Sequence, residues 1–284
     1  MTDNFTIDER TGVGTVTLAV ADLPAMTTYY QEIIGLELLD NGPGQATLGI
    51  GDDIMVRLEH RPDGRQHKRA AGLFHLAILL PSRASLGQWL KHYISTTGTM
   101  IGGAGDHLVS EALYLDDLEG NGIEIYADRP REGWPYKNGE LQMATLAVDI
   151  PDLVAKADPA PFNGMPAGTT LGHVHLQVNN ETAAEAFYES MLGIERITSY
   201  PGATFLGAGG YHHHIGANVW HSRGQSQPPA GSLGLVNFSL RLADNSARDA
   251  VLAHLDSQNV PVTMVGDTPG VMDPAGNQVL LELA

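Results

Sequence analysis

Residues 173–180, HVHLQVNN, decide the fold because this stretch occurs four times in related form. Its counterparts are TVTLAVAD at residues 15–22, HLAILLPS at residues 75–82 and NFSLRLAD at residues 237–244. Each reads as a short alternating strand that ends in a polar residue suited to capping a helix. The four copies align without a gap, so the chain contains an internal repeat.

The residues after each copy extend the repeat into a larger module. An amphipathic stretch follows the first copy, YYQEIIGL at 29–36, and the third, FYESMLGI at 187–194. The second and fourth copies share the endings DLEGNGIE (117–124) and DPAGNQVL (273–280), where Gly-Asn predicts a tight turn before a last strand. The sequence therefore predicts an α+β protein of four tandem βαβββ modules. Their approximate spans are 11–60, 70–130, 170–222 and 232–284.

The best candidate for a domain boundary is a connection rich in Pro and Gly at residues 131–168. It separates residues 1–130, which hold modules one and two, from residues 169–284, which hold modules three and four. Within the connection, AVDIPDLVAKA can form a short element of its own.

Composition excludes several classes of function. The net charge of −17 and pI of about 4.9 disfavour binding to nucleic acid or to an anionic membrane surface. The chain has no cysteine, which excludes disulfides and thiolate ligands, whereas its 12 histidines can serve a metal. The N-terminal MTDNFTIDER has no signal-peptide character, and no apolar run reaches the roughly 20 residues of a membrane span. We expect a cytoplasmic protein.

Four tandem βαβββ modules resemble the vicinal-oxygen-chelate superfamily, which includes glyoxalases, bleomycin resistance proteins and extradiol dioxygenases. The resemblance covers nearly the whole chain. It implies that the modules pair into two curved mixed sheets around a cleft that holds a metal. The stretches FHLAILLP, SEALYL, GNGIE and YHHHIG are similar to those of bacterial catechol 2,3-dioxygenases.

The resemblance implies where the metal ligands lie: at the start of a module's first strand and on its last strand after the Gly-Asn turn. His75, His173 and Glu124 occupy these positions in modules two and three. The corresponding residues of modules one and four are Thr15, Asn237 and Leu280. Two histidines and one carboxylate suit Fe(II) or Mn(II) and leave coordination positions open. Modules two and three are therefore expected to build the metal site together.

The resemblance also implies acid–base residues near the metal. A histidine is expected on the last strand of module three, where YHHHIGANVW spans residues 211–220. Strand alternation places His213 on one face and His212 and His214 on the other. Counting from the Gly turn selects His213 by a thin margin over His214. His107 and Tyr114 fall where a second histidine and a tyrosine are expected, although taken alone they fit a loop residue and a core residue.

These residues predict a metal-dependent extradiol dioxygenase of aromatic catabolism that cleaves catechol or a substituted catechol with O2. The resemblance leaves a homo-oligomer open. One alternative is a glyoxalase-like isomerase or lyase, which generally needs a second carboxylate ligand from the partner module. Another is a non-catalytic binding protein of the same fold, in which the ligand residues are usually lost.

Overall fold

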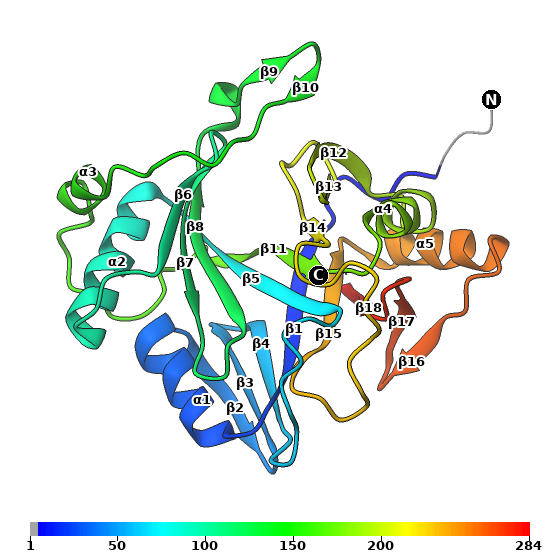
Figure 1. Cartoon of the computed structure of the whole chain (residues 1–284), viewed down its shortest axis with the longest axis horizontal. Coiled ribbons are helices and arrows are strands. Elements are labelled where there is room, and N and C mark those ends of the chain that lie inside the picture. The colour runs from blue at the N-terminus through cyan, green and yellow to red at the C-terminus, as the bar shows by residue number, and fades with distance from the viewer. Residues whose placement is uncertain (1–4) are drawn as a thin grey trace. The chain divides into compact units, whose positions relative to one another are not determined.

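The computed structural model describes residues 5–284 and contains all four βαβββ modules (Figure 1). Their strands form two eight-stranded sheets, and a separate two-stranded sheet joins β9 (Tyr136–Lys137) and β10 (Glu140–Leu141). The large sheets are mixed: the first and last strands of modules two, three and four pair in parallel, whereas the hairpins within each module are antiparallel. The predicted α+β fold is confirmed.

The chain divides into two compact units. One contains the described residues up to Ala19 together with residues 64–74 and 173–284, and the other contains residues 20–63 and 75–172. The division passes through β5 (Gly72–Leu80) and β11 (Thr170–Gln177), so chain segments alternate between the units. The domain boundary at residues 131–168 stays a prediction.

Module one begins with a strand, a helix and a short π-helix. The elements of module one are β1 (Gly12–Val20), α1 (Leu23–Tyr29), η1 (Tyr30–Ile34), β2 (Glu37–Gly42), β3 (Gln45–Ile50) and β4 (Asp53–His60). The predicted amphipathic stretch at 29–36 thus forms the end of this helical segment. Gly35 ends it with a φ of 96°, a left-handed conformation that glycine adopts without strain.

Module two and the connection follow. The elements of module two are β5 (Gly72–Leu80), α2 (Arg83–Thr97), β6 (Gly103–Asp106), β7 (Ser110–Asp116) and β8 (Gly122–Asp128). The elements of the connection are η2 (Arg131–Gly133), β9 (Tyr136–Lys137), β10 (Glu140–Leu141) and α3 (Ile150–Ala155). Helix α3 is the short element expected in AVDIPDLVAKA, and it packs against α2, which covers β8 (Figure 1).

Modules three and four repeat the same order. The elements of module three are β11 (Thr170–Gln177), α4 (Glu181–Ser190), β12 (Glu195–Tyr200), β13 (Ala203–Gly207) and β14 (Ile215–Asn218). The elements of module four are β15 (Gly234–Leu242), α5 (Asn245–Ser257), β16 (Thr263–Val265), β17 (Thr268–Met272) and β18 (Gln278–Leu283). Helix α4 packs on the strands of module three and α5 on β15 and β18 (Figure 1).

The polar residue that ends each repeated strand caps the following helix. The capping side chains are those of Asp22, Ser82, Asn180 and Asp244. Each accepts a hydrogen bond from the backbone N–H three residues ahead, the contact that satisfies an otherwise unpaired helix donor. The capping predicted from the repeat is therefore confirmed in all four modules.

Candidate metal centre

His75 and Glu124 lie side by side in module two because β5 and β8 pair in parallel. Glu124 on β8 is the register partner of Ala77 on β5. Ala77 lies two residues after His75 on β5. The Nε2 of His75 is 2.9 Å from Oε2 of Glu124, and both side chains are buried. A buried carboxylate needs a cation or hydrogen-bond donors to offset the loss of water.

His173 completes a set of three. One ligand atom from each of His75, Glu124 and His173 lies within 4.8 Å of the others, and all three residues are buried. Metal–ligand bonds of about 2.0–2.2 Å place neighbouring ligand atoms about 3 Å apart, close to the separation of His75 and Glu124. Imidazole and carboxylate donors in this combination suit Fe(II) or Mn(II). The residues present therefore fit a divalent metal ion.

The histidine run of module three contacts His173. The ring of His213 lies 4.1 Å from that of His173, and the ring of His212 lies 6.2 Å from it. The Nδ1 atoms of His212 and His213 are 2.9 Å apart, so one ring donates a hydrogen bond to the other. Both side chains are buried.

The strand predicted over residues 211–220 is observed only over Ile215–Asn218, as β14. Gly209 and Gly210, with φ values of 58° and 68°, turn the chain just before the histidines. The predicted alternation of faces is therefore wrong for His212 and His213, whose rings meet. His214 accepts a hydrogen bond from the Ala208 N–H at 3.1 Å and stacks on Tyr211.

Tyr114 lies directly opposite Glu124 in the β7–β8 ladder. Its ring is 5.7 Å from that of His75, and burial, followed by the nearby Glu124 carboxylate, raises its pKa well above the usual value. Tyr114 is therefore a neutral hydroxyl at physiological pH. The turn between β6 and β7 brings His107 to it, with 2.6 Å between Nε2 and the Tyr114 hydroxyl oxygen. The structure thus places Tyr114 next to the candidate ligands His75 and Glu124, and His107 next to Tyr114.

The sequence reasoning missed the residues that hold the turn before Glu124. Asp117 accepts hydrogen bonds from the backbone N–H groups of Glu119 and Asn121, each at 2.9 Å, and from the Asn121 side chain at 2.8 Å. The hydroxyl of Tyr30 donates to the same carboxylate at 3.2 Å. The repeated DxxGN pattern in modules two and four was the available signal.

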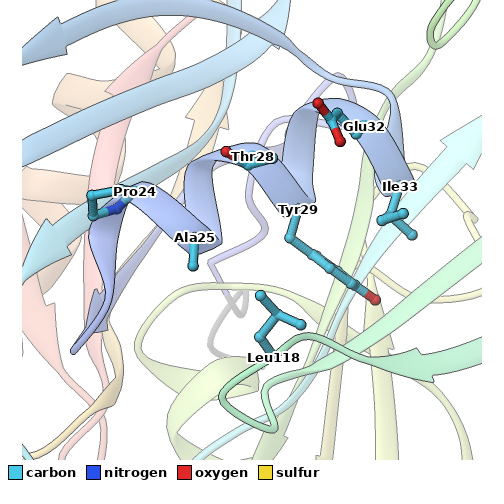
Figure 2. A pocket seen from close by; sticks show the side chains of 7 residues that line it. All are labelled: Pro24, Ala25, Thr28, Tyr29, Glu32, Ile33 and Leu118. Carbon is cyan, nitrogen blue, oxygen red and sulfur yellow. The ribbon is translucent and has the colours of Figure 1, made fainter.

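A shallow hollow of about 430 Å³ lies between α1 and the loop before β8, in the unit of residues 20–63 and 75–172. Figure 2 shows Tyr29 from the helix and Leu118 from the loop facing each other across it. Glu32 is the one carboxylate in its lining, and no histidine takes part. This hollow therefore lacks a set of metal ligands.

Comparison with known proteins identifies the family. Residues 12–125 match the model of the Glyoxalase/Bleomycin resistance protein/Dioxygenase superfamily. The chain is also 38% identical over 274 residues to "Catechol-2,3-dioxygenase" of Bacillus subtilis (strain 168), covering 94% of this chain and 95% of the relative. The chain belongs to this superfamily.

Solved structures of superfamily members share the fold. A putative dioxygenase from Bacillus subtilis superposes with a TM-score of 0.65 at 14% identity, covering 98% of this chain and 86% of the other. Glyoxalase I from Zea mays superposes with a TM-score of 0.57 at 18% identity, covering 95% and 92%. Among residues 5–284, no helix has the length and apolar character required to cross a membrane.

Proposed function

We propose that this protein is an extradiol ring-cleaving dioxygenase that acts on catechol or a substituted catechol with O2. The observation that carries the proposal is the buried set of His75, Glu124 and His173, whose ligand atoms lie within 4.8 Å of one another. The 38% identity to a catechol-2,3-dioxygenase, over nearly the full length of both chains, supports the same reaction.

In this proposal His75, Glu124 and His173 hold Fe(II), or Mn(II), which the same ligand types accept. A metal ion held by these three residues would have further coordination positions available for a diol and for dioxygen. When bound, the metal would supply electron density to two reactants that otherwise combine slowly. The protein contributes a fixed geometry and a buried site.

His213, His107 and Tyr114 handle protons in the proposed reaction. A catechol binds to a metal after losing a proton, and a neutral imidazole is the side chain best suited to accept it near pH 7. His213 is assigned this role because its ring lies 4.1 Å from His173, whereas His214 is engaged with Ala208 and Tyr211. Tyr114 is assigned to orient the diol beside Glu124, and His107 is assigned to exchange a proton with the Tyr114 hydroxyl as charge develops.

The glyoxalase-like alternative is less well supported by the site. It calls for a second carboxylate from the last strand region of the partner module. Residues 211–218 of module three contain three histidines and no acidic residue. The non-catalytic alternative is disfavoured because the three ligand residues are present and close together.

Oxygen consumption by protein loaded anaerobically with Fe(II) tests the proposal. Addition of catechol should cause oxygen uptake and the absorbance of a yellow ring-opened product. His75→Ala and Glu124→Gln should abolish both, whereas Asn237→Ala, at the corresponding position of module four, should leave both unchanged. Metal binding without oxygen uptake on a panel of catechols would overturn the proposed reaction. Failure to bind any divalent metal would overturn the metal site.

A further inference from the structure

The imidazole of His107 contacts two groups of different hydrogen-bonding character. Its Nδ1 lies 2.7 Å from the backbone carbonyl oxygen of Ala144, and its Nε2 lies 2.6 Å from the hydroxyl oxygen of Tyr114. A carbonyl oxygen can only accept a hydrogen bond, so Nδ1 must carry a proton. In a neutral ring Nε2 then accepts, and the Tyr114 hydroxyl donates to it.

The carbonyl of Ala144 belongs to the connection after module two, far along the chain from β6. Its position is set by a two-bond bridge between Asp106 and Leu146, in which each N–H donates to the other's carbonyl at 2.9 Å. Leu146 is 51% exposed, so backbone hydrogen bonds hold this segment at Leu146.

Side-chain contacts of Asp106 also fix the turn that carries His107. Asp106 accepts a hydrogen bond from the Leu108 N–H at 3.0 Å and pairs with Arg129 at 2.7 Å. Leu108 has a φ of 69°, an uncommon conformation for a residue with a side chain. Gly105 lets the ring approach, because a Cβ there would lie 2.9 Å from His107 Nε2.

We propose that residues 142–147 of the connection act as a positioning element for His107, with the Ala144 carbonyl selecting its Nδ1–H tautomer. This proposal rests on the proposed dioxygenase function. Because Nε2 then carries no proton, it can accept the proton of the Tyr114 hydroxyl, for which the Glu124 carboxylate is the other acceptor. Ala144 is thus a positioning residue that acts through its backbone.

The tautomer can be read without any turnover. In the full chain labelled with ¹⁵N at histidine and free of metal, NMR should show His107, assigned by its loss in His107→Gln, protonated at Nδ1 and unprotonated at Nε2. Leu146→Pro removes the N–H that bonds to Asp106, and Leu146→Ala is the matched control that keeps it. The proline variant should lose the Nδ1–H preference, whereas the alanine variant should keep it.

The kinetic consequence is measured with the Fe(II)-loaded enzyme and catechol. Leu146→Pro should lower kcat by about tenfold at unchanged metal content and KM, since acid–base groups contribute about 10²–10⁴-fold when well placed. Gly105→Ala should give the same pattern by displacing the ring, and it serves as the second variant if the proline variant does not fold.

Each outcome decides one of the two proposals. A His107 protonated at Nε2 in the unsubstituted chain, or a folded Leu146→Pro with unchanged tautomer and kcat, would overturn the positioning role. Absence of oxygen uptake together with the expected tautomer would overturn the dioxygenase proposal and leave the Ala144–His107 contact as a structural one.

Discussion

Two turns in this molecule, at residues 117–121 and 273–277, are built alike and lead into strands of different chemistry. In each, one carboxylate oxygen of the aspartate accepts the N–H of the asparagine four residues ahead, at 2.9 Å for Asp117 and 2.8 Å for Asp273. The other oxygen accepts the asparagine side chain at 2.8 Å in both turns. Gly120 and Gly276 both adopt left-handed φ values, of 82° and 89°, which favour glycine.

A buried tyrosine from the preceding module completes each turn. Tyr30 donates to Asp117 at 3.2 Å, and Tyr188 donates to Asp273 at 3.0 Å. Burial raises the pKa of both aspartates, and the hydrogen bonds that they accept oppose this rise. Each turn therefore fastens a module's last strand to the helical segment of the module before it.

The strands after the two turns differ at equivalent positions. Glu124 is the register partner of Ala77 and Tyr114, whereas Leu280 is the partner of Ser239 and Gly270. A Cβ at Gly270 would lie 2.7 Å from Leu280 Cδ2, so the apolar side chain occupies the space that a larger neighbour would need. The same turn therefore precedes a candidate metal ligand, Glu124, in module two and a buried apolar residue, Leu280, in module four.

The largest expected effect comes from making module two like module four. Glu124→Leu should reduce affinity for Fe(II) or Mn(II) by more than about 100-fold, because loss of a ligand exceeds the 10–100-fold effect of losing a supporting contact. The reverse change, Leu280→Glu, should create no metal site, since Thr15 and Asn237 are the first-strand residues of modules one and four. Metal content per chain after loading and dialysis measures both. A Glu124→Leu protein that keeps one metal per chain would contradict the ligand assignment.

Removing Asp117 or Asp273 tests whether the two turns contribute equally to stability. Asp117→Ala and Asp273→Ala should each destabilise the fold by about 3 kcal/mol or more, because several buried donors lose a charged acceptor. Asp117→Ala alone should also weaken metal binding, by about 10–100-fold, since it loosens the strand that presents Glu124. Urea unfolding and metal titration separate these effects. Equal metal affinity in the two variants would show that the turn does not position Glu124.

A smaller effect is expected from the two tyrosine hydroxyls. Tyr30→Phe and Tyr188→Phe should each cost about 1–2 kcal/mol of stability, the contribution of one hydrogen bond to a buried carboxylate. The hydroxyl stabilises the ionised aspartate and so lowers its raised pKa; the loss should be larger at pH 8, where the carboxylate is ionised, than at pH 4. Urea unfolding at the two pH values measures this. A cost that does not depend on pH would mean that the bond is made equally well to the protonated acid.

The order of strands, helix caps and turns within the modules was predictable from the sequence because its signals are local. Alternation followed by a capping side chain marks the start of every module, and the repeated DxxGN pattern marks the last strands of modules two and four. The closeness of His75 and Glu124 follows once the first and last strands of a module pair in parallel. The resemblance supplied the rest of the candidate ligand set.

What the sequence did not reveal depends on contacts between distant segments or on glycine conformations. Tyr30 and Asp117 are 87 residues apart, and neither has a local pattern that points to the other. The Ala144 carbonyl has no side-chain signature at all. In the histidine run, Gly209 and Gly210 end the strand periodicity from which the faces of His212 and His213 were predicted.

The helix caps of modules two and four should differ in how their contribution to stability depends on pH. Ser82 and Asp244 each accept a hydrogen bond from the backbone N–H three residues ahead, at 3.1 Å and 3.0 Å. Only Asp244 is ionisable, and it also pairs with Arg10. Ser82→Ala should lower the free energy of unfolding by about 1 kcal/mol at any pH at which the protein is folded.

The pKa of Asp244 is lowered, first by the Ala247 N–H and then by Arg10. A lowered pKa means that its contribution is present above the usual aspartate pKa and is lost as pH falls through the folded value. Urea midpoints between pH 6 and pH 3 should therefore converge with the unsubstituted protein for Asp244→Ala and stay displaced for Ser82→Ala. If the two variants kept a constant difference over this range, the cap of module four would be acting through hydrogen-bond geometry alone.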